Sequence, residues 1–217
     1  MGEEMKIRKY RELYLGRIFL AFIISTIVFV LFFIFAYSIS YLNYQKISSQ
    51  SGIIENSIVN FEETLGDFEC NNELLIDASE RFDDAAQKLN LLEKRFGKQD
   101  RRVLELKERY SELEYRHFLI TKKFNLECNT SYITVFFFYS NRNDDKEEES
   151  ERMGFILTAF ERREAEKIMI YALDFDLNIG LINGLKEQYN VTRAPFVVIN
   201  EKDIVYVRHI NELEKYL

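Results

Sequence analysis

The sequence predicts three successive parts: a membrane-spanning helix, a long antiparallel helical hairpin and a C-terminal α/β domain. Three observations support this fold class: a run of 22 residues without a charge, two stretches of heptad spacing, and an alternation of strand and helix patterns toward the C-terminus. The expected parts are a tail at 1–17, a spanning helix at 18–41, a helical stalk at 42–70, the hairpin at 71–127, and the α/β domain at 130–217.

The uncharged run covers residues 18–39. As a helix it would extend about 33 Å, close to the roughly 30 Å hydrocarbon core of a bilayer. A cleaved signal peptide is the alternative, but the run is long for one and its end at 35–38 lacks a small-x-small pattern. We therefore expect a retained single-pass anchor.

Basic residues near the run predict its orientation. Only Lys46 follows it closely, whereas five basic residues precede it: Lys6, Arg8, Lys9, Arg11 and Arg17. The positive-inside rule then places the N-terminus in the cytoplasm and everything after Tyr41 outside the cell membrane. The net charge of −7 lies mostly in this outer part, which argues against nucleic acid as a partner.

Two heptad seams predict the hairpin. The first comprises Leu75, Ala78, Phe82, Ala85, Leu89, Leu92 and Phe96, and the second comprises Val103, Leu106, Tyr110, Leu113, His117, Ile120 and Phe124. Between them, Gly97 is typical of a helix end and Asp100 of a helix start. The short connection requires antiparallel helices, and pairing Phe82 with His117 sets alanines opposite larger side chains. On this seam His117 is expected to be a packed core histidine.

The same register places Cys70 opposite Cys128, the only cysteines in the chain. In an oxidising compartment a disulfide between them would close the open end of the hairpin. Both lie one position off the seam, so the bridge requires at least one of them outside a helix. Asn125 could end one helix, and Asn71 or Asn72 could begin the other. Two buried thiols and a redox-active pair remain the alternatives.

The heptad phase extends backward into the stalk, through Phe68, Leu65, Phe61, Ile58, Ile54, Ser51 and Ile47. The second hairpin arm would not reach this stripe, so it needs another cover: a homodimer partner, the C-terminal domain or another protein. Gly52 and Gly66 favour a broken, bent stalk as an alternative to one continuous helix.

From Tyr132 onward, strand and helix patterns alternate. The expected strands are 133–139, 168–173, 196–199 and 204–208, and the expected helices are 150–164, 178–189 and 211–217. The single proline of the chain, Pro195, stands directly before the third strand.

This region, about 85 residues long, resembles the thioredoxin superfamily. The resemblance rests on YALDFDLN at 171–178, YNVTRAP at 189–195 and FVVIN at 196–200, with the hairpin and helix that follow. It implies a central mixed sheet, a cis peptide between Ala194 and Pro195, and an extended peptide bound along the backbone of Arg193, Ala194 and Pro195.

The departure from that family concerns its chemistry. The family carries a Cys-x-x-Cys motif just after the first strand, where this chain has residues 141–146, and no cysteine follows Cys128. The domain therefore cannot perform dithiol exchange alone. Acidic residues in 144–149 suit an ordinary helix start. The sequence predicts no catalytic residue, cofactor or metal site, and it has two candidate glycosylation sites, Asn129 and Asn190.

Two classes of function follow. The first is a membrane-anchored protein whose redox-inactive thioredoxin-like domain binds a protein or peptide, or acts as a scaffold. The second is an accessory thiol–disulfide oxidoreductase that uses Cys70 and Cys128. A purely structural spacer is a third interpretation.

Overall fold

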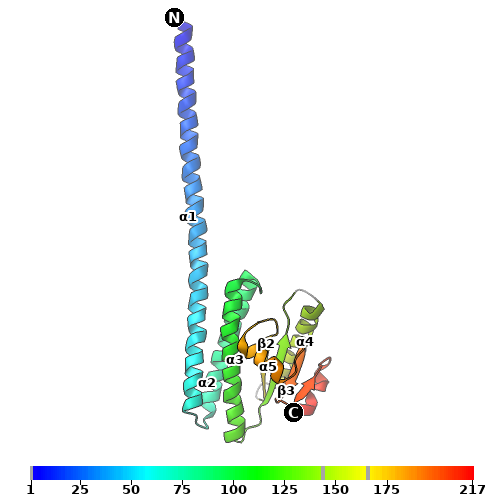
Figure 1. The fold of residues 1–217 in the computed structure, drawn as a ribbon. Coiled ribbons are helices and arrows are strands. Elements are labelled where there is room, and N and C mark those ends of the chain that lie inside the picture. Colours follow the sequence, from blue (N-terminus) through cyan, green and yellow to red (C-terminus); the bar gives the residue numbers. More distant parts are fainter. Residues whose placement is uncertain (1, 143–144, 165–166) are drawn as a thin grey trace. The chain divides into compact units, whose positions relative to one another are not determined.

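The structure is a computed structural model that describes residues 2–142, 145–164 and 167–217 (Figure 1). It divides into two compact units, Met1–Ser48 and Ser49–Leu217. Helix α1, Gly2–Gly66, contributes to both.

The first unit contains the apolar segment Arg17–Leu42, within which a stretch of 18 residues has a mean hydropathy of 3.1. By length and composition this segment could cross a membrane, although a signal sequence near an N-terminus would have the same character. Two of its hydroxyl groups bond within the helix: Thr26 Oγ1 donates to the carbonyl of Phe22 and Ser38 Oγ to that of Ile34, both at 2.9 Å. Such bonds leave no polar group of these two side chains unpaired in an apolar surrounding.

In the second unit, the end of α1 packs with α2, Asn72–Phe96, and α3, Arg101–Glu127. The α2–α3 pair is antiparallel in the predicted register, and the rings of Phe82 and His117 stack with centroids 5.0 Å apart. The expected caps are present. Asn71 and Asp100 accept the N–H groups of Glu73 and Arg102, and Gly97 ends α2 at a φ of 91°, which favours glycine.

The stalk stripe is covered by the hairpin itself. Helix α1 is continuous through Gly52 and stops at Gly66, and its last turns lie parallel to α3, with Phe61 against His117. Phe68, just beyond the end of α1, packs against Phe124. Ile54, Ile58 and Phe61 are buried there. The expectation that the hairpin would not reach this stripe was therefore wrong, because residues 67–71 reverse the chain and return α2 and α3 alongside α1. The side chains of Ile47 and Ser51 lie outside the described residues.

The C-terminal part contains a four-stranded mixed sheet in the order β2-β1-β3-β4. The strands are β1, Ile133–Tyr139; β2, Ile168–Asp174; β3, Phe196–Ile199; and β4, Asp203–Val205. Strand β1 pairs in parallel with β2 and antiparallel with β3, and β3 pairs antiparallel with β4. In this register, Phe136 of β1 lies opposite Tyr171 of β2 on one side and Val198 of β3 on the other.

Alternate residues of each strand enter two cores, as the period of two requires. One face of the sheet packs against α3 and against α5 (Gly180–Gln188). The other face packs against α4 (Asp145–Arg163) and two short 3-10 helices, η1 (Ile210–Glu212) and η2 (Glu214–Tyr216). Phe118 of α3 belongs to the first core, so the hairpin and the sheet share one hydrophobic interior.

Several boundaries differ from expectation. Helix α4 begins earlier than residue 150, because acidic residues favour the first turn of a helix. Strand β4 is shorter than 204–208, and the expected closing helix at 211–217 is two short 3-10 turns around buried Leu213. Helix α5 is likewise shorter than 178–189.

The outer edge of β2 is closed by two carboxyl groups rather than by another strand. Glu114 Oε1 on α3 accepts the N–H of Ala172 at 2.8 Å, and Glu161 on α4 accepts the N–H of Ile170. Free edge N–H groups would otherwise be available to another chain. Because α3 lies against this edge of the sheet, it is also buried on a second face, formed by Lys107, Ser111, Glu114, Phe118 and Thr121.

Candidate functional site

The candidate peptide site lies at the loop before β3. The Ala194–Pro195 peptide is cis, as the resemblance implied. Ala194 and Pro195 are buried, whereas Arg193 is exposed. The structure contains no peptide, so the binding role of these three residues stays a prediction.

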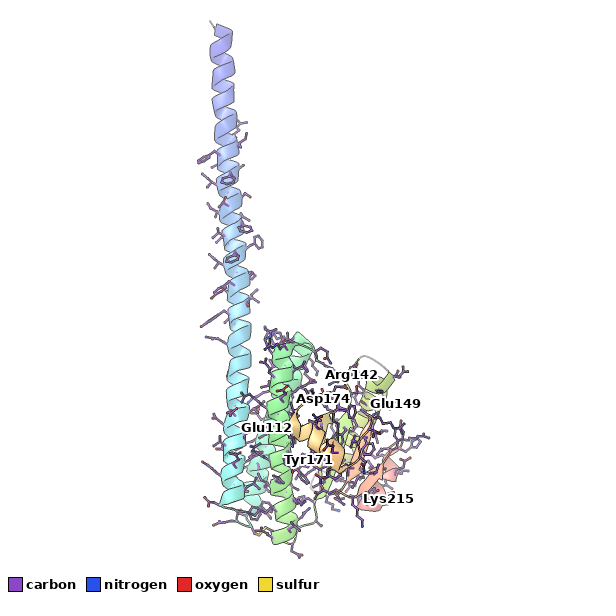
Figure 2. All side chains as sticks on the ribbon, in the orientation of Figure 1. Glu112, Arg142, Glu149, Tyr171, Asp174 and Lys215 are labelled. Carbon is purple, nitrogen blue, oxygen red and sulfur yellow. A yellow bond between two sulfur atoms is a disulfide. The ribbon has the colours of Figure 1, made fainter. Side chains whose placement is uncertain are left out.

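A pocket of about 610 Å³ opens beside this loop. Arg193, Ala194 and Pro195 form one part of its lining. The other lining residues are Glu149 of α4, labelled in Figure 2, and Tyr206, Arg208 and Glu212, which follow β4.

The charges in the pocket are of both signs. The guanidinium of Arg208 lies 5.3 Å from the centroid of the Tyr206 ring, and its backbone N–H donates to Glu212 Oε2 at 3.1 Å. Arginine, glutamate and a half-exposed tyrosine offer both hydrogen-bond donors and acceptors together with an apolar ring. Such a lining suits an extended polypeptide better than an ion of one sign.

The loop after β1, where the sequence resemblance would place a pair of cysteines, has a structural role here. Ser140 Oγ donates to Asp176 Oδ2 at 2.7 Å, Asn141 Nδ2 donates to Asp174 Oδ2 at 3.1 Å, and Gln99 Nε2 donates to the Asn141 carbonyl at 2.9 Å. Arg142 pairs with Asp176 at 2.6 Å. Asn143 and Asp144 lie outside the described residues.

A buried charge network connects this loop to the hairpin. Lys107, only 2% exposed, pairs with Asp174 at 3.0 Å and with Glu93 at 2.7 Å. A lysine buried this fully needs such partners because desolvation of its charge is costly. The sequence carried a signal, since Lys107 belongs to a second stripe of α3 at helical spacing. That stripe was missed because four of its five members, all but Phe118, are polar or charged.

A second polar cluster lies under the hairpin around His117. Its Nδ1 lies 3.0 Å from the Tyr171 hydroxyl and its Nε2 lies 3.1 Å from Ser79 Oγ, and Thr121 Oγ1 also contacts that hydroxyl at 3.0 Å. Burial lowers the pKa of His117 to about 4, so the ring is neutral at pH 7. Burial also raises the pKa of Tyr171. His117 is the packed core histidine that the sequence predicted.

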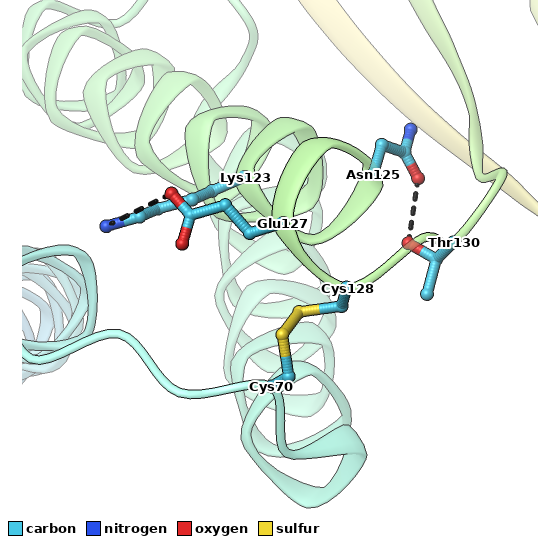
Figure 3. The surroundings of a disulfide bond; sticks show 6 residues. All are labelled: Cys70, Lys123, Asn125, Glu127, Cys128 and Thr130. Atoms are coloured by element: carbon cyan, nitrogen blue, oxygen red, sulfur yellow. Dashed lines mark hydrogen bonds and ion pairs between the residues drawn. A yellow bond between two sulfur atoms is a disulfide. The ribbon is translucent and has the colours of Figure 1, made fainter.

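Cys70 and Cys128 form a disulfide (Figure 3), with an S–S distance of 2.04 Å and Cα atoms 5.4 Å apart. Neither lies inside a helix: Cys70 precedes α2, and Cys128 directly follows α3, which ends at Glu127 rather than at Asn125. Asn125 instead anchors the next loop, accepting the N–H of Tyr132 at 2.8 Å. The alternative of two free thiols is therefore wrong, since the chain has no free cysteine.

The two candidate glycosylation sites are both accessible. Asn129 and Asn190 are exposed and have φ values of 54° and 53°. Asparagine tolerates this left-handed conformation better than most residues. Whether either carries a glycan stays a prediction.

Among the residues that the structure describes, no group of three or more histidine, cysteine, aspartate or glutamate side chains could hold a metal ion. Comparison with known proteins provides no family assignment: no protein family and no curated protein matches this chain.

Proposed function

We propose that this chain is a single-pass membrane protein whose C-terminal thioredoxin-like domain binds an extended peptide or protein segment without redox chemistry. The observation that carries the proposal is the pocket beside Pro195, lined by Arg193, Tyr206 and Arg208. A peptide in this pocket would meet donors, acceptors and an aromatic ring, which together can hold both a backbone and a side chain.

The loop after β1 supports the non-redox part of the proposal. Asn141 begins the segment 141–146, where the resembled family has its cysteines, and its amide donates to Asp174, while the preceding Ser140 donates to Asp176. The only sulfur atoms of cysteine are in the Cys70–Cys128 bridge, outside the sheet.

We further propose that the N-terminus is cytoplasmic and that the unit Ser49–Leu217 lies outside the cell membrane. The basic residues ahead of the apolar segment support this orientation. The disulfide supports it as well, because such bonds persist in oxidising compartments. Protease added to sealed, right-side-out vesicles should digest this unit, and complete protection would refute the orientation.

Peptide binding can be tested with the full-length chain in nanodiscs and a phage-displayed peptide library. A recovered peptide should bind Arg193→Ala and Arg208→Ala about tenfold more weakly, the equivalent of about 1.4 kcal/mol each. Arg152→Ala is the matched control, since Arg152 is an exposed arginine of α4 outside the pocket lining. Equal affinity for all three variants, or no enriched peptide, would count against the proposal.

The second candidate is an accessory oxidoreductase, and the exposure of Cys70 favours it. Alkylation of intact membranes with and without prior reduction separates the two candidates. A fully oxidised pair indicates a structural bridge, whereas mixed disulfides with other proteins indicate exchange.

A further inference from the structure

A second cleft, of about 650 Å³, lies between α2 and α4 and is distinct from the pocket beside Pro195. Its floor includes Phe137, Ile170 and Ala172 from β1 and β2. Leu89 lines the α2 wall, and Phe155 and Leu157 line the α4 wall. Volume and lining fall in the range of small-molecule sites, which are concave, mainly apolar and furnished with a few polar groups.

One end of the cleft is closed by paired charges. Lys98, just beyond α2, binds Glu147 at 2.8 Å and Glu151 at 3.2 Å on α4. Nearby Glu93, also in the lining, is paired with buried Lys107. With Lys94, a further lysine of the lining, three ammonium groups face these three carboxylates and leave little net charge for a ligand.

The other end is acidic. Asp83 lies one helical turn before Ala86, a lining residue of α2, and Glu161 lies one turn after Thr158, a lining residue of α4. Tyr110 also lines the cleft, and burial, then Glu114 and Tyr139, and then Asp83 and Glu161 raise its pKa.

The chain itself only partly balances these carboxyl groups. Burial, followed by the charge of Asp83, raises the pKa of Glu161 to about 7, and the N–H of Ile170 and the guanidinium of Arg162 lower it only in part. This end of the cleft would therefore favour a positive charge.

We propose that the cleft between α2 and α4 binds a largely apolar small molecule that carries one cationic amine. Its apolar body would cover Phe137, Leu157 and Ile170. Its amine would lie toward Asp83 and Glu161, near the ring of Tyr110, where a cation gains from both carboxylate and aromatic attraction. This site does not depend on peptide binding beside Pro195.

Photolabelling of the full-length chain in nanodiscs tests the proposal. Three aryl-diazirine probes of the same body are used, a benzylamine, a benzyl alcohol and a benzoate, and labelled peptides are identified by mass spectrometry. The apolar segment Arg17–Leu42 should be labelled in every variant and serves as an internal standard. In the wild type, the amine should label the α2 and α4 cleft peptides about tenfold more than the benzoate, about 1.4 kcal/mol of preference.

Two variants and a control give the decisive comparisons. Thr158→Trp fills the cleft and should abolish its labelling, whereas Ala159→Trp, at the adjacent exposed position outside the lining, should not. Glu161→Gln, which leaves the cleft open, should remove the preference for the amine while labelling by the alcohol stays unchanged. Equal labelling by amine and benzoate, labelling that persists in Thr158→Trp, or an amine preference that survives in Glu161→Gln would overturn the proposal.

Discussion

Replacing Lys107 with methionine should destabilise the chain strongly. The lysine side chain is 2% exposed and lies between Asp174, 4% exposed, and Glu93, 15% exposed. Removing one partner of a buried ion pair costs roughly 3 to 5 kcal/mol, because a charge remains buried without compensation. Asp174 would keep the amide of Asn141 at 3.1 Å and the N–H of Asp176 at 3.0 Å, so we expect about 3 kcal/mol, at the lower end.

Urea unfolding of the full-length chain, followed by circular dichroism, measures this loss as a shift in midpoint at constant slope. Lys88→Met is the matched control, because the Lys88–Asp84 pair lies on the surface of α2 and should contribute only about 0.3 to 0.5 kcal/mol. Adding Asp174→Asn to Lys107→Met should recover much of the stability, since the stranded charge is removed. A loss below about 1 kcal/mol for Lys107→Met, or one equal to that of Lys88→Met, would refute the reasoning.

Three further predictions concern other parts of the unit Ser49–Leu217. Because the pKa of Glu161 is raised to about 7, its protonated form stabilises the fold fully below its ordinary value of 4.5, and this contribution is lost as the pH rises through about 7. Above pH 7, Glu161→Gln should thus be about 1 to 2 kcal/mol more stable than the wild type, after allowance for solvent screening, and near pH 4 the two should be equally stable. If variant and wild type were equally stable at both pH values, this reasoning would be contradicted. Replacing Cys70 and Cys128 together by alanine should lower the unfolding free energy by about 4 kcal/mol, from the entropy of a loop of 58 residues, and a reductant should then have no further effect on the unfolding midpoint. Tyr171→Phe should lower the free energy of unfolding by about 1 to 3 kcal/mol, because the hydrogen bond between the Tyr171 hydroxyl and His117 is lost. An unchanged midpoint of thermal unfolding would show that this hydrogen bond contributes nothing to stability.

Much of the fold follows from local patterns. The apolar segment, the hairpin, its caps at Gly97 and Asp100, and the strands β1 and β3 lie where the sequence predicted them. Each depends on neighbours a few residues apart, so spacing and capping chemistry are enough to indicate them. The closing helix was wrong because its seven residues are too few for propensity alone to hold a helix, and packing around Leu213 accommodates 3-10 turns.

The candidate site was predictable only in part. The sequence indicated Pro195 and its neighbours, but not Tyr206 and Arg208, which reach the same pocket through the hairpin of β3 and β4. The carboxyl groups of Glu114 and Glu161 had no recognisable pattern, since an acidic residue on a helix is ordinarily a solvated one. Their roles arise only where α3 and α4 meet the edge of β2.

The sequence by itself determined most of the helices and strands, though not the 3-10 turns at the C-terminus, that one segment is apolar enough for a membrane, and that the C-terminal part has no cysteine of its own. The tertiary structure decided which element buries each apolar surface. Helix α3 packs against both the stalk stripe and one face of the sheet, and Lys107 connects the hairpin to the loop after β1. The reason is physical. Hydrophobic periodicity records that a face is buried but not which distant segment buries it, and a charge enters the interior only when packing brings its partners together.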